Sequence, residues 1–545
     1  MAVPMWQQNY TPIADSLWLS APIAALPIFV MLLLLGVMRK PAWIAALSGL
    51  GTAVVVALFA YGMPVGTMLG AVGYGAAFGL FPIGWIVFTA ILLYRITVET
   101  GKFEIIKDSL GSLTTDPRLQ ALLIAFAFGA FIEGAAGFGT PVAVAAAMLA
   151  GLGFSPFYAA GICLLANTAP VAFGSIGIPV ITLAGITGLP VNDLSASVGR
   201  ICAPISLLVP AYLILVMGGW RGLGGVWPAA LLCGAGFAGM QFYASNYLGP
   251  QLVDILSSLT AIVLTIGVLA MWKPKEHFHL EGSTEIPKLR PKHPLGEILL
   301  AWSPYLLLVG YVLIWGQDWA KVYLNKVTIT FPWPGIHNLV ERVEPVVKAP
   351  APYAAVYTFN WLSAAGTACL LAVITAMIVL RASGEIVKKV FVTTCKQLAL
   401  SELTIASVLA LAFLLNYCGA TATLGLAFAA TGVLFPFFSA LLGWLGVFLT
   451  GSDTSANALF GNLQVITANR LGLDPILMAS SNSSGGVMGK MISLQSIAVA
   501  AAATGMKPEE EAKLFRFTLR HSILLASLIG LVTVFYAYVM PEWAH

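Results

Sequence analysis

Long apolar runs separated by short polar stretches recur along the whole chain. They cover residues 21–38, 41–61, 65–98, 119–152, 157–190, 201–218, 224–243, 253–271, 298–316, 358–380, 400–450, 454–468, 475–505 and 522–540. A helix needs about 20 apolar residues to cross a bilayer. The pattern therefore predicts an all-α polytopic membrane protein with about 12–14 transmembrane helices. Several runs are long but interrupted by Gly or Pro, so we also expect broken or re-entrant helices.

Two polar segments divide this pattern. Residues 272–297 separate a first membrane half, residues 1–271, from a second half, residues 298–545. Residues 317–357 form the longest stretch outside the runs, and they are mixed in charge and rich in Pro. We expect residues 272–297 to be a polar cytoplasmic loop and residues 317–357 to be a small structured loop outside.

Basic residues indicate the orientation of the first span. The run ends at Arg39 and Lys40, whereas residues 1–20 contain neither Lys nor Arg. Basic loops favour the cytoplasmic side, and a cleavable signal peptide starts with a basic region. We therefore expect a retained first span, an N-terminus outside, and a multi-pass protein of the bacterial cytoplasmic (inner) membrane.

Composition narrows the class of protein further. Only 9% of the residues are charged and 59% are hydrophobic, with a mean hydropathy of +0.90, whereas soluble domains are about 25% charged. The net charge of +4 arises from 27 basic and 23 acidic residues, a balance that gives no basic patch for nucleic acid. These figures exclude a soluble, disordered or fibrous chain.

Three charges stand alone inside long apolar stretches: Glu133, Asp453 and Lys490. A charge at the centre of a membrane helix costs about 2.5–3.5 kcal/mol on insertion scales, so such residues usually have a function. The alternatives are a structural ion pair or a position at the end of a span. Arg95, Arg200 and Asp254 lie at the edges of runs, where a side chain can reach the interface.

Three polar, Gly-rich stretches have the composition of broken membrane helices. They are residues 133–141 with 167–170, residues 451–457, and residues 480–486 leading to Lys490. Each could begin a half-helix, whose free N–H groups suit a small carboxylate. The predicted substrate ligands are Asn167, Thr168, Ser452, Thr454, Ser455, Asn482, Ser483, Ser484 and Lys490. The alternative is close helix packing by small residues.

Parts of the chain resemble one another at long range. Residues 100–123 resemble residues 382–400, and residues 167–182 resemble residues 453–467. Weak internal symmetry with paired broken segments is typical of transporters that bind substrate at the repeat interface. The pattern predicts a two-fold internal repeat and leaves open whether its copies are inverted.

Several long motifs resemble those of the bacterial L-lactate permease family. They are GAFIEGAAGFGTPVAV (129–144), NTAPVAFG (167–174), GWLGVFLTGSDTSANALFG (443–461) and SNSSGGVMGKMIS (481–493), with WQQNY (6–10), GGWRG (218–222) and LFRFT (514–518) on the flanks. The resemblance covers essentially the whole chain. It implies a proton-driven carrier of L-lactate, and also of D-lactate and glycolate. It further suggests inverted repeats with re-entrant hairpins and an elevator-like mechanism.

Other functions are weighed against this carrier. No GxxxxGK[ST] motif is present, since Lys490 is followed by Met491, so ATP-driven transport is not expected. A carrier for another small carboxylate, a sodium-coupled carrier and, less favoured, an ion channel stay as alternatives. We predict no enzyme activity, cofactor or metal site; His277, His279 and His293 could bind a metal, but a solvated loop explains them. The oligomeric state is left open.

The isolated acids are the candidate proton carriers. Burial disfavours the charged form of a carboxyl group, so such a group can take up and release a proton during transport. We favour Glu133 over Asp453, because Asp453 lies among residues that can cap a helix. Lys490 could bind the substrate carboxylate, or it could pair with Asp453 or Glu133 and leave that acid on protonation.

Overall fold

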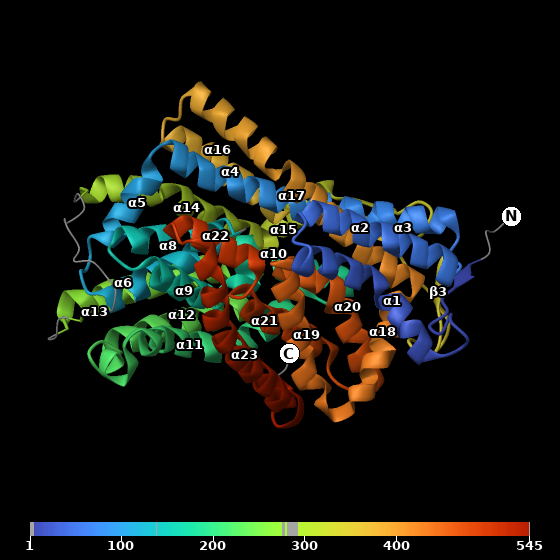
Figure 1. Cartoon of the computed structure of the whole chain (residues 1–545). Coiled ribbons are helices and arrows are strands. Elements are labelled where there is room, and N and C mark those ends of the chain that lie inside the picture. The colour runs from blue at the N-terminus through green and yellow to red at the C-terminus, as the bar shows by residue number, and fades with distance from the viewer. Residues whose placement is uncertain (1–4, 138, 275–277, 281–292, 544–545) are drawn as a thin grey trace.

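The computed structural model describes residues 5–137, 139–274, 278–280 and 293–543, and helices dominate it (Figure 1). Eleven of the described helices are long and apolar enough to cross a membrane, or twelve if the bent pair Pro156–Ala166 and Val171–Thr187 counts as one span. The predicted all-α polytopic fold is confirmed, with 11 or 12 such helices where about 12–14 were expected. Helices dominate because the bilayer interior offers no water to satisfy free backbone groups.

The helices of the first half precede the polar segment. In chain order they are α1 (Leu17–Leu32), α2 (Ala42–Val55), α3 (Val65–Phe78), α4 (Trp85–Glu99), α5 (Lys102–Gly111), α6 (Pro117–Gln120), α7 (Gly129–Ala135), α8 (Thr140–Gly151), α9 (Pro156–Ala166), α10 (Gly174–Thr187), α11 (Val191–Gly224), α12 (Trp227–Tyr247) and α13 (Val253–Met271). Wider π-helical turns continue four of them, at η1 (Leu33–Val37), η2 (Val56–Ala60), η3 (Gly79–Gly84) and η4 (Ala121–Phe128).

The second half contains the remaining α-helices. They are α14 (Leu295–Gly316), α15 (Asp318–Leu324), α16 (Ala365–Val379), α17 (Gly384–Cys418), α18 (Ala420–Phe428), α19 (Phe435–Thr450), α20 (Asp453–Leu471), α21 (Pro475–Lys490), α22 (Leu494–Thr504) and α23 (Pro508–Tyr538). Tight 3-10 turns occur at η5 (Val171–Phe173), η6 (Pro250–Leu252), η7 (Asn325–Val327), η8 (Ala429–Leu434) and η9 (Pro541–Trp543).

Several helices begin where the sequence supplies a capping side chain followed by Pro. Asp116 accepts a hydrogen bond from the backbone N–H of Arg118, and Asp474 accepts from Ile476 and Leu477. Ser155 accepts in the same way from Tyr158. Such caps satisfy N–H groups that have no partner inside the helix, and Pro fits the first helical position.

The segment predicted as a structured loop contains short strands. They are β2 (Ile329–Pro332), β3 (Val340–Arg342), β4 (Ala351–Pro352) and β5 (Val356–Phe359), together with the N-terminal β1 (Trp6–Gln7). The strand β1 pairs in parallel with β3, which pairs antiparallel with β4, while β2 and β5 form a separate antiparallel pair. Gln8 then donates to the carbonyls of Asn416 and Tyr417, which ties this layer to the end of α17.

The two halves of the sequence pack through one another. Helix α17 from the second half lies against α2, α3 and α4 from the first, as the orange and blue ribbons of Figure 1 show. Helix α10 packs against α20, and α11 packs against α21. Residues near the centre of the molecule therefore come from both predicted halves.

The order of elements around the breaks is the same in each half. Helices α7 and α8 are separated at residues 136–139, and α9 and α10 at residues 167–173. In the second half α17 gives way to α18 at Gly419, and α19 gives way to α20 at residues 451–452. The two-fold repeat and the relative orientation of its copies stay a prediction.

Candidate functional site

The second predicted break forms the start of α20. Gly451 adopts a left-handed backbone conformation with a φ of +73°. Ser452 is the N-cap of α20, and its hydroxyl accepts from the backbone N–H of Ser455 at 3.3 Å. Asp453 is therefore the first residue of the helix, where the positive end of the helix dipole favours a carboxylate.

The break between α9 and α10 lies opposite α20. Ser175 and Ile176 both have positive φ values, 47° and 60°, at the start of α10. Ser175 donates to the carbonyl of Ala136 at 3.0 Å and so joins this break to the one after α7. A Cβ at Gly174 would lie 2.6 Å from Oε1 of Glu133, so the absence of a side chain there makes room for the Glu133 carboxyl.

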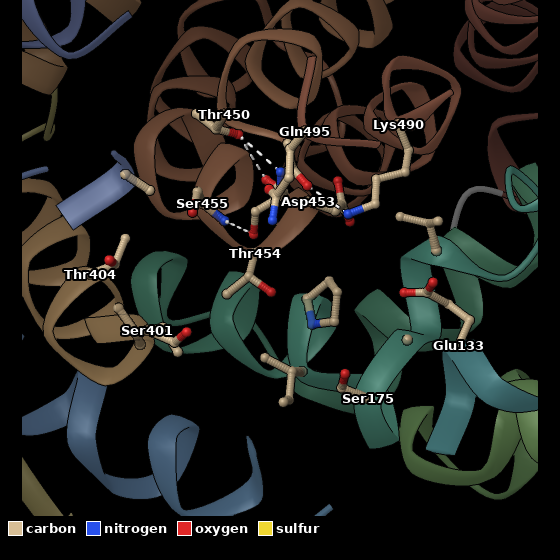
Figure 2. A pocket seen from close by; sticks show the side chains of 18 residues that line it. Glu133, Ser175, Ser401, Thr404, Thr450, Asp453, Thr454, Ser455, Lys490 and Gln495 are labelled. Carbon is tan, nitrogen blue, oxygen red and sulfur yellow. Dashed lines mark hydrogen bonds between the residues drawn. The ribbon is translucent and has the colours of Figure 1, made fainter. Parts of the chain in front are cut away.

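These breaks surround one cavity with about 160 Å³ of space for water-sized molecules (Figure 2). Its wall comes from α2, α7, the α9–α10 break, α10, α17, the α19–α20 break, α20, α21 and α22. The lining residues are Ala42, Glu133, Val171, Gly174, Ser175, Ile178, Pro179, Ser401, Thr404, Ile405, Thr450, Gly451, Ser452, Asp453, Thr454, Ser455, Lys490 and Gln495. All three isolated charges are among them, as are four predicted ligands: Lys490, Ser452, Thr454 and Ser455.

Asp453 is held by a chain of polar side chains behind the cavity. It is 3% exposed, and its Oδ2 accepts from Ser483 at 2.7 Å and from Asn457 at 3.3 Å. Asn482 donates to Asn457 at 3.0 Å, and Gln464 donates to Asn482 at 3.0 Å. Such a connected network fixes the orientation of a buried carboxyl. The other carboxyl oxygen of Asp453, Oδ1, has no hydrogen-bond partner among the described residues.

Lys490 ends α21 and extends into the cavity. Its Nζ donates to the carbonyl of Gly451 at 2.6 Å. It interacts electrostatically with both Glu133 and Asp453, but within the described part of the chain no ion pair joins it to either acid. An ammonium has three donors, so two remain for another acceptor. Figure 2 shows Lys490 reaching toward Asp453, with Glu133 on the facing wall.

Glu133 lies in the last turn of α7 and is 5% exposed. Its Oε2 has no hydrogen-bond partner in the described structure. Asn167 lies beside it, and both amide atoms of Asn167 also lack partners. Two unsatisfied buried polar groups next to each other mark a place where a water, proton or ligand would bind.

The third predicted break is wrong, because residues 480–486 lie inside the continuous helix α21. Its small residues let α21 approach α19 closely. A Cβ at Gly443 of α19 would overlap the carbonyl oxygen of Asn482, and one at Gly485 would overlap that of Ala440. The stretch is thus an instance of the packing alternative, and the actual break follows Lys490, at residues 491–493.

Five predicted ligands do not line the cavity. Thr168 donates to the carbonyl of Leu165 at 2.7 Å, and Asn167 lies beside Glu133. Asn482 and Ser483 belong to the network that holds Asp453. Ser484 is fully buried in α21.

Two features near the cavity were not evident from the sequence: the burial of Asp254 and the polar wall contributed by α17. Asp254 was assigned to a run edge, where it could reach the interface. It is instead 1% exposed, and Pro250 and Leu252 of the η6 turn before it are buried as well. Ser401 and Thr404 of α17 also line the cavity, and their spacing of three residues on one helix face was the available signal.

The histidines of the polar segment do not meet at one point. His277 lies outside the described residues, and His279 is exposed. Nε2 of His293 lies 3.4 Å from Oδ2 of Asp108, and its Nδ1 lies 3.3 Å from Oε2 of Glu297. Within the described ranges no group of three or more potential metal ligands occurs.

The fold and the cavity define a class: a multi-pass α-helical membrane protein with broken helices around a central polar cavity, as in transporters. The profile of the L-lactate permease family matches residues 20–540, and the chain belongs to that family. It is 46% identical to the L-lactate permease of Bacillus subtilis, over 97% of this chain and 98% of that one.

Two further relatives from Escherichia coli K12 are similar over nearly their whole length. The glycolate permease GlcA is 46% identical over 98% of each chain, and the L-lactate permease is 44% identical over 98% of this chain and 99% of that one. Among solved structures, the YdaH transporter of Alcanivorax borkumensis aligns with a TM-score of 0.45 at 16% identity, over 86% of this chain and 87% of that one.

Proposed function

We propose that this chain is a secondary active transporter that takes up L-lactate, and also D-lactate and glycolate, by proton symport across the bacterial cytoplasmic membrane. One observation carries the proposal: a single cavity is lined by Lys490, Asp453 and Glu133 where broken helices from both halves meet. The substrate class is supported by the names of the relatives, L-lactate permease and glycolate permease.

The cavity suits a small 2-hydroxy monocarboxylate in size and chemistry. One water needs roughly 10–15 Å³ of such space, so about 160 Å³ holds the six non-hydrogen atoms of lactate together with some water. In this proposal Lys490 binds the carboxylate. The hydroxyls of Ser452, Thr454 and Ser455 serve the substrate hydroxyl, since a hydroxyl both donates and accepts.

The remaining predicted ligands take supporting parts in this proposal. Asn167, whose amide lies beside the Glu133 carboxyl, orients that acid by a hydrogen bond. Asn482 and Ser483 hold Asp453 in place, while Thr168 and Ser484 shape the packing behind the cavity.

Proton coupling follows from the charges of the cavity. A lactate anion that enters beside two carboxylates is repelled, and Lys490 is attracted to those same carboxylates. Protonation of one acid removes a negative charge and leaves the ammonium available to the substrate, so proton and anion favour each other's binding. Glu133, whose Oε2 is unpartnered, is the preferred carrier, and Asp453 is the second candidate.

The proposal includes an orientation and a mode of transport. The basic residues after the first run support an N-terminus outside, with residues 272–297 on the cytoplasmic side. The matching order α7–α10 and α17–α20 supports a two-fold repeat. If its copies are inverted, their motion would alternate access to the cavity in an elevator-like manner.

The proposal is tested with purified protein in proteoliposomes and a panel of small hydroxy acids. Adding L-lactate, D-lactate or glycolate outside should make the external medium more alkaline, because each anion enters with a proton. Preloaded lactate should drive saturable counterflow of labelled lactate, which a channel does not support. Uptake that requires sodium, or activity only with a different carboxylate, would favour one of the alternative carriers.

A further inference from the structure

Asp254 is a buried carboxyl group that the proposed mechanism has not used. It lies in the first turn of α13 and is 1% exposed. Neither Oδ1 nor Oδ2 has a hydrogen-bond partner among the described residues. A buried, unpaired carboxylate is strongly disfavoured, whereas uptake of a proton removes its charge.

Asp254 stands directly against the segment that carries Glu133. Gly134, which follows Glu133 in the sequence, has no side chain, and a Cβ there would lie only 2.6 Å from the Cβ of Asp254. This close approach of α7 to α13 places the two carboxyl groups within electrostatic range of each other. Oε2 of Glu133 likewise lacks a partner in the described structure. Two neighbouring carboxyls away from water cannot both be charged at low cost.

Among the described residues, the elements packed most closely on α13 provide no counter-charge for Asp254. They are α7, α10, α12, η4 and η6. Of these, α7 contributes Glu133, and the other four contain no acidic or basic residue. The thiol of Cys202 on α11 also interacts electrostatically with Asp254. Lys490 interacts with Glu133 from the cavity side.

The two acids differ in their access to the cavity. Glu133 lines the cavity, whereas Asp254 is absent from its wall. Of the two carboxyl groups, Glu133 is therefore the one that meets the cavity.

We propose that Glu133 and Asp254 form a carboxyl pair that shares one proton, with Asp254 holding the proton away from the cavity and Glu133 exchanging it with the cavity. The inference rests on the proposed proton symport. In the uptake step an O–H bond forms on a carboxylate oxygen as a hydronium ion gives up its proton to it. The same O–H bond breaks on release to water at the other side.

Asp193 offers a matched control. Like Asp254 it lies in the first turn of a long helix, α11, but it is exposed. Replacing either residue with Asn removes a negative charge from the start of a helix. A difference in behaviour between the Asp254→Asn and Asp193→Asn proteins is therefore due to the burial of Asp254 beside Glu133 and not to the helix dipole.

The first measurement needs no substrate. Infrared difference spectra of the full chain in lipid vesicles, labelled with ¹³C-aspartate, follow the carbonyl band of protonated carboxyl groups over pH. We expect Asp254→Asn to remove a labelled band that Asp193→Asn keeps, and Glu133→Gln to shift the pH at which that band disappears. A spectrum unchanged by Asp254→Asn would overturn the pair, whatever the substrate is.

The second measurement is transport by the same proteins. We expect Asp254→Asn to lose accumulation driven by a proton gradient while lactate counterflow persists, which also shows that the variant is folded. Asp254→Glu should recover part of the accumulation, and Asp254→Asn with Glu133→Gln should be no worse than either change alone, as for residues that act as a unit.

The two levels of the proposal fail in different ways. Wild-type protein that shows the Asp254 band without lactate transport would refute the proposed function and keep the pair. Wild-type protein with proton-driven lactate uptake, alongside Asp254→Asn protein with the same uptake and pH profile, would refute the pair and keep the function.

Discussion

Lys490 is the single basic side chain among the described residues that line the cavity, and its ammonium has donors free beyond its bond to Gly451. If it binds the substrate carboxylate, Lys490→Ala removes a charged hydrogen bond worth about 1.5–3 kcal/mol. We therefore expect lactate affinity in counterflow to fall by roughly tenfold to more than a hundredfold.

The control for Lys490 is a surface lysine. Lys389 pairs with Glu99 and its side chain is 63% exposed, so Lys389→Ala should keep wild-type affinity, because exposed ion pairs contribute little. Unchanged affinity in Lys490→Ala, together with a displaced pH profile, would instead assign Lys490 to balancing the charge of Asp453 or Glu133.

A substitution at Glu133 tests the coupling of proton movement to lactate transport. Glu133→Gln keeps the shape of the side chain but cannot take up and release a proton. We expect it to abolish accumulation driven by a pH gradient and to leave lactate exchange partly intact, because exchange needs no net proton movement. The exposed acid Glu385 serves as control through Glu385→Gln. A wild-type pH dependence in Glu133→Gln would remove Glu133 from this role.

Single residues show what hydropathy can and cannot predict. Glu133, Asp453 and Lys490 were identified because each is isolated in apolar sequence, and that isolation is visible without a structure. Asp254 was not identified, since it lies at the edge of a run. At such a position the sequence does not distinguish a charge that reaches water from a charge that is buried in protein. The difference arises from Gly134 on another helix, a contact between residues more than a hundred positions apart.

At the scale of elements, the contact between α19 and α21 depends on missing side chains. A Cβ at Gly443 would overlap the carbonyl oxygen of Asn482, so Gly443→Ala must push α21 away from α19. Overpacking of this kind costs about 1–3 kcal/mol, and it would displace Asn482 from the network that holds Asp453. We expect a lower thermal unfolding midpoint in detergent and weaker lactate transport.

A glycine with open surroundings provides the comparison. Gly310 lies in α14, and a Cβ there would meet nothing within 4 Å. Gly310→Ala should keep or slightly raise the thermal unfolding midpoint, because Ala has a higher helix propensity than Gly. Equal midpoints for Gly443→Ala and Gly310→Ala would contradict the packing argument.

The same contact explains why the third break was predicted wrongly. Ser480 to Gly486 has the small polar composition of a broken helix, and so does the stretch that starts α20 at Asp453. The chain turns before Asp453 because Gly451 adopts a left-handed conformation. Residues 480–486 stay helical, because Gly443 of α19 and Gly485 of α21 let these two helices pack closely. Local composition allows both outcomes, and the partner helix selects one.

At the scale of the whole molecule, the apolar runs were sufficient to predict an all-α membrane protein. The bilayer sets the length of every span and requires that the backbone N–H and C=O groups of the span be hydrogen-bonded. The apolar runs could not show how the halves pack. The assignment of residues 1–271 and 298–545 to two halves follows the chain, yet α17 lies among α2, α3 and α4. Long-range packing of this kind leaves no periodic signal in either segment.

The energetics of the whole cycle determine which gradients drive lactate accumulation. Moving one lactate anion into a negative-inside compartment costs about 2.3 kcal/mol per 100 mV. A co-transported proton cancels that cost and adds the pH gradient as a driving force. With the potential clamped at zero, an inward proton gradient should therefore drive accumulation of lactate in proteoliposomes. At a ratio of one proton per lactate, imposing a potential at equal pH should add nothing, and more than one proton would make a negative interior favourable. Accumulation driven by a sodium gradient alone, at fixed pH, would contradict proton symport and favour the sodium-coupled alternative.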